Sequence, residues 1–125
     1  MKAWIPLMLT IALGSAVHAD SSCTYPRAPD SIPDGSTATK EQMIAAKNDV
    51  SRYNNEMNAY LDCVSHEIDA AKPKDGAKLS KDEKAKADEQ VKILTQKHDA
   101  AVDELQAVAG RFNEQLKIYK AKQQP

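Results

Sequence analysis

In two long stretches of this chain, mostly apolar residues recur at alternating intervals of three and four residues. A short segment containing proline and glycine separates the two stretches. In the first stretch the repeating positions are Met43, Ala46, Val50, Tyr53, Met57, Tyr60 and Val64. In the second they are Ala87, Val91, Leu94, His98, Ala101, Leu105, Val108 and Phe112. This spacing places one stripe on each of two helices, so the sequence predicts an all-α fold with a coiled-coil-like seam.

The start of each helix is marked by a capping box, in which two side chains satisfy the first free amide groups of the helix. The two pairs of residues that fit this pattern are Thr39 with Gln42 and Ser80 with Glu83. Between the helices, Pro73 disfavours helix continuation, and Asp75-Gly76 is typical of a turn. We therefore expect a long antiparallel two-helix hairpin over 39–121, with its helix, turn and helix at 39–72, 73–79 and 80–121, and a tail at 122–125.

A reversal at this turn would bring together residues whose numbers have a nearly constant sum. Met57 would then face Leu94, Tyr53 would face His98, and Met43 would face Val108. Several such layers combine a large residue with a small one, which fills a core evenly. Separate long helices in a parallel dimer could use the same heptads, but they would leave the turn segment without a purpose.

Residues 1–19 have the features of a secretory signal peptide. Lys2 precedes a mostly apolar run from Trp4 to Val17, and Ala19 stands at the expected cleavage position. The run is shorter than the ~20 apolar residues that a bilayer span needs. We therefore expect a periplasmic or secreted protein, cleaved after Ala19, with no stable membrane span after cleavage.

The next segment, residues 20–38, is a proline-rich arm. Its prolines at 26, 29 and 33 exclude a helix or the interior of a sheet. The chain has two cysteines, Cys23 and Cys63, and an even count in an exported chain favours a disulfide. Extended chain covers ~3.1 Å per residue and a helix rises ~1.5 Å per residue, so the arm can fold back and reach Cys63. Closing this loop is expected to stabilise the fold by roughly 4 kcal/mol.

The residues that could carry chemistry are few. Cys63 and His66 share a helix face but lack further metal ligands, so we expect no metal or cofactor. His98 faces Tyr53 in the expected register, and a structural hydrogen bond explains the pair better than catalysis does. Ser65, His66 and Asp69 fall within about one helical turn, where an intact helix offers no oxyanion donors. We therefore expect a protein that is not an enzyme.

Net charge and composition limit the classes of molecule that the protein is expected to bind. The chain carries a formal net charge of −1, which gives no global field for nucleic acid, and its aromatic residues are too few for base stacking. Basic residues gather at two places, near the turn and near the C-terminus: Lys72, Lys74, Lys78 and Lys81, and Arg111, Lys117, Lys120 and Lys122. These helix ends support an alternative function, in which the protein binds anionic envelope components.

One flank of the seam carries further apolar residues, and two more continue beyond the start of the first helix. Together they form the candidate interaction surface: Leu61, Ile68, Val102, Ala109, Phe112, Leu116 and Tyr119. Two outcomes stay open at this point. Either the arm covers this surface through Tyr25, Ile32 and its prolines, or the surface is free for an unknown protein partner or a homodimer. Gly110 is expected to let the Pro33-Asp34-Gly35 turn approach the second helix closely.

Several motifs resemble a group of small exported helical proteins of Gram-negative bacteria that have a Cys-Pro-rich arm. They are Cys23-x-x-Pro26, the Pro33-Asp34-Gly35 turn, "YLDC" and "AVAGRFNEQLKIYK". The resemblance implies export and a helical hairpin, and it transfers no activity or functional residue. The sequence as a whole therefore predicts an exported, non-enzymatic interaction or structural module of the bacterial envelope.

Overall fold

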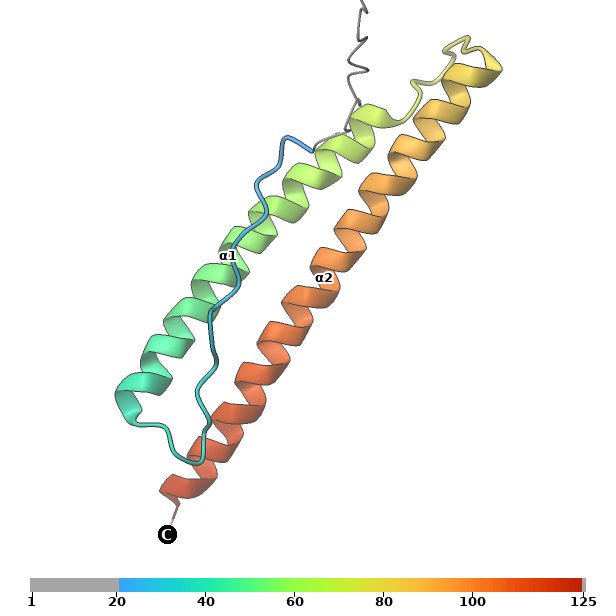
Figure 1. Cartoon of the computed structure of the whole chain (residues 1–125). Helices are drawn as coiled ribbons and strands as arrows, with labels where there is room; N and C mark the ends of the chain where they lie inside the picture. Colours follow the sequence, from blue (N-terminus) through green and yellow to red (C-terminus); the bar gives the residue numbers. More distant parts are fainter. Residues whose placement is uncertain (1–20, 125) are drawn as a thin grey trace, which may run out of the picture.

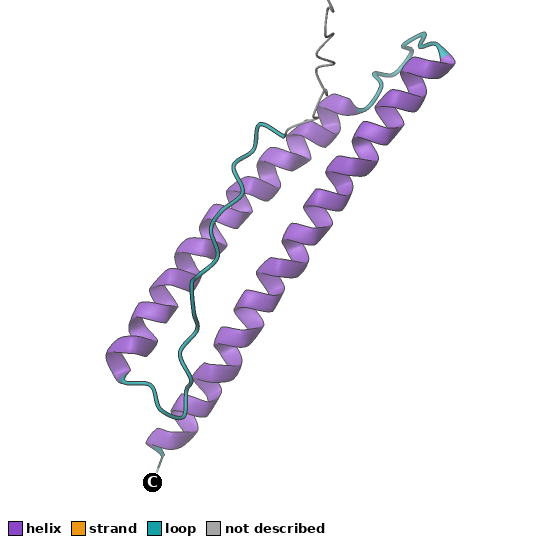
Figure 2. Ribbon diagram, in the orientation of Figure 1, coloured by secondary structure: helices purple, strands orange, loops and turns teal. Residues whose placement is uncertain are grey.

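The computed structural model describes residues 21–124, which form two long helices and the loops that precede and join them (Figure 1). Helix α1 spans Lys40–Ala71, and helix α2 spans Lys81–Gln123. The helices run antiparallel and side by side, and no strand occurs within the described residues (Figure 2). The predicted all-α hairpin is confirmed. The expected signal peptide, 1–19, lies outside the described residues.

Both capping boxes are present. The Thr39 hydroxyl accepts a hydrogen bond from the Gln42 amide, and the Thr39 amide donates to the Gln42 side chain. Ser80 and Glu83 form the same reciprocal pair at the start of α2. These bonds satisfy amide groups that have no partner inside the helix, and they fix where each helix begins.

Nearby residues also account for the turn between the helices and for the C-terminal end of α2. Gly76 adopts a φ of 77°, a left-handed conformation that favours glycine, and it turns the chain between the helices. Helix α2 continues to Gln123, beyond the expected end at residue 121. Lys120 and Lys122 lie in this last turn, where positive charge interacts favourably with the helix dipole. Within residues 21–124, neither helix contains an apolar run long enough to cross a bilayer.

The buried residues form two clusters along the seam. The larger cluster consists of Tyr53, Met57, Tyr60, Val64, Leu94, Ala101 and Val108. The smaller cluster consists of Ala38, Met43, Ala46 and Phe112. All of these helical positions belong to the predicted stripes, and Met57 and Leu94 share a cluster as expected. The expected pairing of Met43 with Val108 is wrong, because these residues belong to different clusters and Ile32 of the arm packs against both.

The arm therefore acts as a third packing element. It begins beside the C-terminal half of α1, runs along the hairpin, and turns near the C-terminal end of α2 (Figure 1). Cys23, Ala28 and Ile32 pack against the larger cluster, and Ala38 is itself a buried member of the smaller one. Each helix thus packs against two neighbours over this length, and the seam is closed from one side.

Candidate interaction surface

The arm is fixed at its first end by a disulfide and by a carboxylate. Cys23 and Cys63 are joined, with their Cα atoms 5.8 Å apart, which confirms the predicted disulfide. Next to it, Glu67 accepts three hydrogen bonds: from the Ser21 hydroxyl at 2.7 Å, the Ser22 amide at 2.7 Å and the Ser22 hydroxyl at 2.8 Å. The hydrogen bonds from Ser21 and Ser22 hold the pKa of Glu67 below its ordinary value.

The sequence analysis did not identify this role of Glu67. The available signal was the pair of hydroxyl residues just before Cys23. Once Cys23 is joined to Cys63, the residue one helical turn after Cys63 lies within reach of the residues that precede Cys23. The sulfur atoms and the Glu67 carboxylate lie within 4.8 Å of one another, but disulfide sulfurs are not thiolate ligands, so this group does not make a metal site.

The middle of the arm is fixed by packing. Tyr25 meets Tyr60 edge to face, with ring centroids 4.9 Å apart, and Pro26 is buried. A shallow hollow between arm and α1 is lined by Thr24, Pro26, Glu56, Ala59, Tyr60 and Cys63. A second hollow lies between the arm and α2, where Ile32 is near Val108 and Arg111. The arm thus follows the side of the seam that carries Glu56, Cys63 and Arg111.

The arm's second end is fixed against the last turns of α2. The Gly35 amide donates to the Gln115 side-chain oxygen at 2.8 Å, and Lys122 donates to the Ala38 carbonyl oxygen at 3.1 Å. A Cβ atom at residue 35 would overlap the backbone carbonyl of Gln115, so this position accepts only glycine without rearrangement. The expectation that Gly110 permits this approach is wrong, because a Cβ there would meet nothing within 4 Å. The small residue is needed on the arm, not on the helix.

The candidate interaction surface lies largely on the other side of the seam from the arm. Helical spacing places Leu61 and Ala109 across the seam face from Cys63 and Arg111, beside which the arm runs. Six members of the surface are partly exposed: Leu61, Ile68, Val102, Ala109, Leu116 and Tyr119. Phe112 differs, since it is 7% exposed and belongs to the smaller buried cluster. Phe112 therefore supports this surface from beneath.

Two residues expected to form a hydrogen-bonded pair do not do so. The Tyr53 side chain is 0% exposed, and its hydroxyl has no hydrogen-bond partner among the described residues. Burial raises the pKa of Tyr53 to about 12. His98 is partly exposed, and its Nδ1 atom lies 3.4 Å from a carboxylate oxygen of Asp99. The predicted Tyr53–His98 bond is thus wrong, because the imidazole turns toward solvent and its neighbour along the helix.

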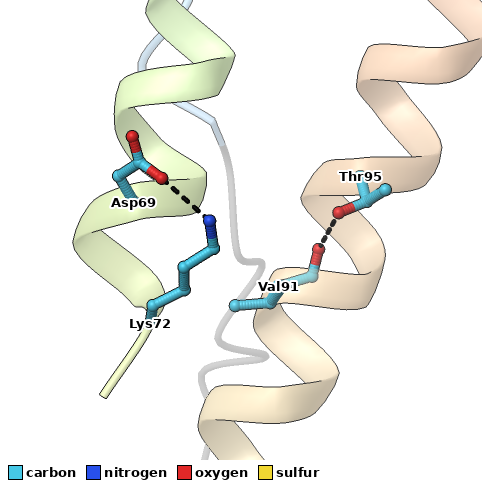
Figure 3. Close-up of polar contacts among 4 residues, drawn as sticks. All are labelled: Asp69, Lys72, Val91 and Thr95. Atoms are coloured by element: carbon cyan, nitrogen blue, oxygen red, sulfur yellow. Dashed lines mark hydrogen bonds and ion pairs between the residues drawn. The ribbon is translucent and has the colours of Figure 1, made fainter. Parts of the chain in front are cut away.

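The remaining polar candidates make local contacts. Asp69 accepts a hydrogen bond from Lys72 at 2.9 Å, and on α2 the Thr95 hydroxyl donates to the Val91 carbonyl at 2.8 Å (Figure 3). The hydrogen bond from Lys72, followed by the positive charge of Lys72, lowers the pKa of Asp69. The first contact joins α1 to its C-cap residue and the second lies within α2, so neither brings together residues of α1 and α2. At the basic C-terminal end, Lys122 donates a hydrogen bond to the Ala38 carbonyl oxygen, and its Nζ atom lies 5.4 Å from the centre of the Tyr119 ring.

No protein-family model, curated protein or solved structure matches this chain. What the molecule can do must therefore be inferred from its own geometry: a rod of two helices, a covalently fixed arm along one side, and partly exposed apolar side chains on the other.

Proposed function

We propose that the protein is an exported, non-enzymatic interaction or structural module of the bacterial envelope, and that it binds a protein partner or a second copy of itself. The observation that carries this proposal is the division of the rod into two sides. The arm packs along the side of Cys63 and Arg111, while Leu61, Ile68, Val102 and Leu116 on the other side stay partly exposed. A row of apolar side chains that stay partly exposed is typical of a protein-binding surface.

The covalent clamp supports both parts of the proposal. Disulfides form and persist in oxidising compartments such as the periplasm, which agrees with the signal peptide expected at 1–19. A clamped rod also binds at low entropic cost, because its backbone is already ordered before the partner arrives. The long helix surface then presents side chains at fixed positions, which is the property required of an interaction or structural module.

The experiment compares two double variants in crosslinking and light scattering. Leu61→Asp with Leu116→Asp places two charges on the apolar flank. Asn55→Asp with Gln96→Asp adds the same charges at exposed positions that face away from the seam on α1 and α2. We expect the first variant to lose self-association or partner capture in the native envelope, while the second behaves as the parent protein.

Thermal unfolding of both variants, followed by circular dichroism, shows that the helices persist and that lost binding is not lost folding. A parent protein that is strictly monomeric, and that captures the same partners as the Leu61→Asp, Leu116→Asp variant, would contradict the proposal. Added salt separates this function from the alternative, in which Lys117 and Lys120 bind anionic envelope components. Charge-driven binding weakens steeply with salt, whereas apolar docking does not.

A further inference from the structure

The disulfide is accessible from solvent. Cys23 and Cys63 are both partly exposed, and Cys63 lines the shallow hollow of about 300 Å³ between the arm and α1. Thiol–disulfide exchange requires a thiolate to reach one of the two sulfur atoms, so access decides whether a disulfide can exchange. The remaining residues that line this hollow are mostly small or apolar, and the nearby carboxylate of Glu56 is paired with Arg52 at 2.9 Å. The hollow therefore leaves space beside Cys63 in which a thiol can be placed.

The polar anchors of the arm lie only at its two ends. At the first end they are the disulfide and the three hydrogen bonds to Glu67, and at the second they are the bonds to Gln115 and Lys122. Among the described residues, the segment 24–33 between them forms no hydrogen bond to either helix; its one side-chain bond joins Arg27 to Asp30 within the arm. Side-chain packing alone holds this segment on the hairpin.

A buried polar atom lies at this interface. The Tyr53 hydroxyl is fully buried and has no hydrogen bond of good geometry among the described residues, and the neighbouring Tyr25 hydroxyl of the arm contributes to the raised pKa of Tyr53. Leaving a hydroxyl unpaired in this way costs stability, and the cost disappears when water reaches the group. Movement of the arm away from the seam would admit that water. The closed arm therefore carries a cost that the disulfide offsets.

We propose that the arm is a redox-released strap: exchange of Cys23–Cys63 with a dithiol frees residues 21–33 while the hairpin of α1 and α2 stays folded. A thiolate of the dithiol attacks the Cys63 sulfur and forms a mixed disulfide, and Cys23 leaves as a thiolate that takes up a proton. The second thiol of the dithiol then attacks the mixed disulfide and releases Cys63 as a thiol. The dithiol ends oxidised to a disulfide, and the protein has gained two electrons and two protons.

Release uncovers the arm side of the seam, including Tyr60, against which Tyr25 packs. The second end stays in place, because Gly35 and Ala38 are themselves buried and keep their bonds to Gln115 and Lys122. At the first end, two of the three bonds to Glu67 join exposed groups, so water can replace them once the covalent link is gone. The arm would thus swing about the Pro33-Asp34-Gly35 turn. This inference does not depend on the proposed interaction flank, which lies on the other side of the seam.

Limited trypsin digestion tests the strap, because three potential cleavage sites report on three different regions. Arg27 precedes Ala28 in the arm, Lys78 precedes Leu79 in the loop between the helices, and Arg52 precedes the buried Tyr53 within α1. We expect reduction by dithiothreitol to accelerate cleavage after Arg27 by about tenfold or more, since local opening controls proteolysis of a docked segment. Cleavage after Lys78 should change less than about twofold, and Arg52 should stay protected.

A Cys23→Ser, Cys63→Ser variant is the matched control. Without any reductant it should show the rapid Arg27 cleavage, and reductant should not accelerate it further. Nitration of Tyr53 by tetranitromethane, absent in the oxidised protein, should appear in this variant. Unchanged cleavage after Arg27 on reduction would overturn the proposal, because the arm would then stay docked. Parallel acceleration at Arg52 would overturn it as well, because the hairpin would then unfold with the arm.

Discussion

The half of the hairpin that the arm covers differs from the half next to the loop at 72–80. All buried side chains of the described helices lie between Met43 and Val64 of α1 and between Leu94 and Phe112 of α2. Toward the loop, four residues of the seam are only partly buried: Ile68, Ala71, Ala87 and Val91. In the loop itself Leu79 is 42% exposed.

This difference between the two halves shows that the heptad pattern alone does not determine how deeply a side chain is buried. Val64 and Val91 both belong to the predicted stripes, yet Val64 is fully buried and Val91 is not. Two helices enclose a seam from two directions only, and each side remains open to water. The arm closes one of these sides through Pro26, Ala28 and Ile32, so the core forms where three chain segments meet.

The largest predicted effect compares one substitution in the two regions. Leu94→Ala removes a side chain that is 2% exposed in the larger cluster and should lower the free energy of unfolding by about 3 kcal/mol. Leu79→Ala makes the same change in the loop and should cost about 0.5 kcal/mol or less. Urea denaturation followed by circular dichroism measures both values. Equal losses in the two variants would show that the covered half is not the more stable one.

A pair of glycines gives the next prediction. Gly35→Ala places a methyl group against the Gln115 carbonyl and should destabilise the fold by about 2 kcal/mol, because the arm must shift. Gly110→Ala adds the same group in open space within α2, and it should stabilise the fold by about 0.5–1 kcal/mol. Thermal unfolding of the two variants tests whether arm contact, not helix propensity, governs this end. If both alanine variants were more stable than the parent protein, the close approach of the Gly35 turn to α2 would be refuted.

The smallest predicted effect concerns the pH dependence of the first anchor. The pKa of Glu67 is lowered in the folded state from its ordinary value of 4.5 by the bonds from Ser21 and Ser22, so the ionised form stabilises folding above that value. The contribution should be lost as the pH falls through the lowered pKa. Glu67→Gln should therefore destabilise the protein more at about pH 7 than at about pH 3.

A Ser21→Ala, Ser22→Ala variant provides the control for this titration, since it removes the two hydroxyl donors and keeps both the carboxylate and the Ser22 amide donor. It should lose most of the pH-dependent part that Glu67→Gln loses. A difference between parent and Glu67→Gln that is equal at both pH values would mean that the bonds to the arm do not set the pKa.

Much of the fold follows from local patterns in the sequence. The capping boxes at Thr39 and Ser80, the turn at Gly76 and the disulfide were all predictable, because each depends on a few neighbouring residues or on the only two cysteines. The packing contacts that could not be predicted from the sequence are those that depend on the path of the arm. Met43 and Val108 belong to different clusters, Ile32 of the arm packs against both clusters, and no local pattern encodes these contacts.

The candidate surface shows the same division. Heptad spacing correctly placed Leu61 and Val102 beside the seam, but it could not distinguish a partly exposed side chain from the buried Phe112, which depends on Ala38 from the arm. Glu67 and Gln115 were missed as anchors, since their partners lie far away in the sequence. Long-range polar contacts of an irregular segment carry no periodic signal.

Hydrogen exchange of the oxidised protein, resolved by residue with NMR, tests most directly whether the arm adds stability to the part of the core that it covers. Amides of 53–64 and 94–108 should exchange only through global unfolding, whereas those of 66–71 and 84–91 should exchange through smaller local openings. Uniform protection along both helices, or slower exchange next to the loop than beneath the arm, would contradict a core made of three segments.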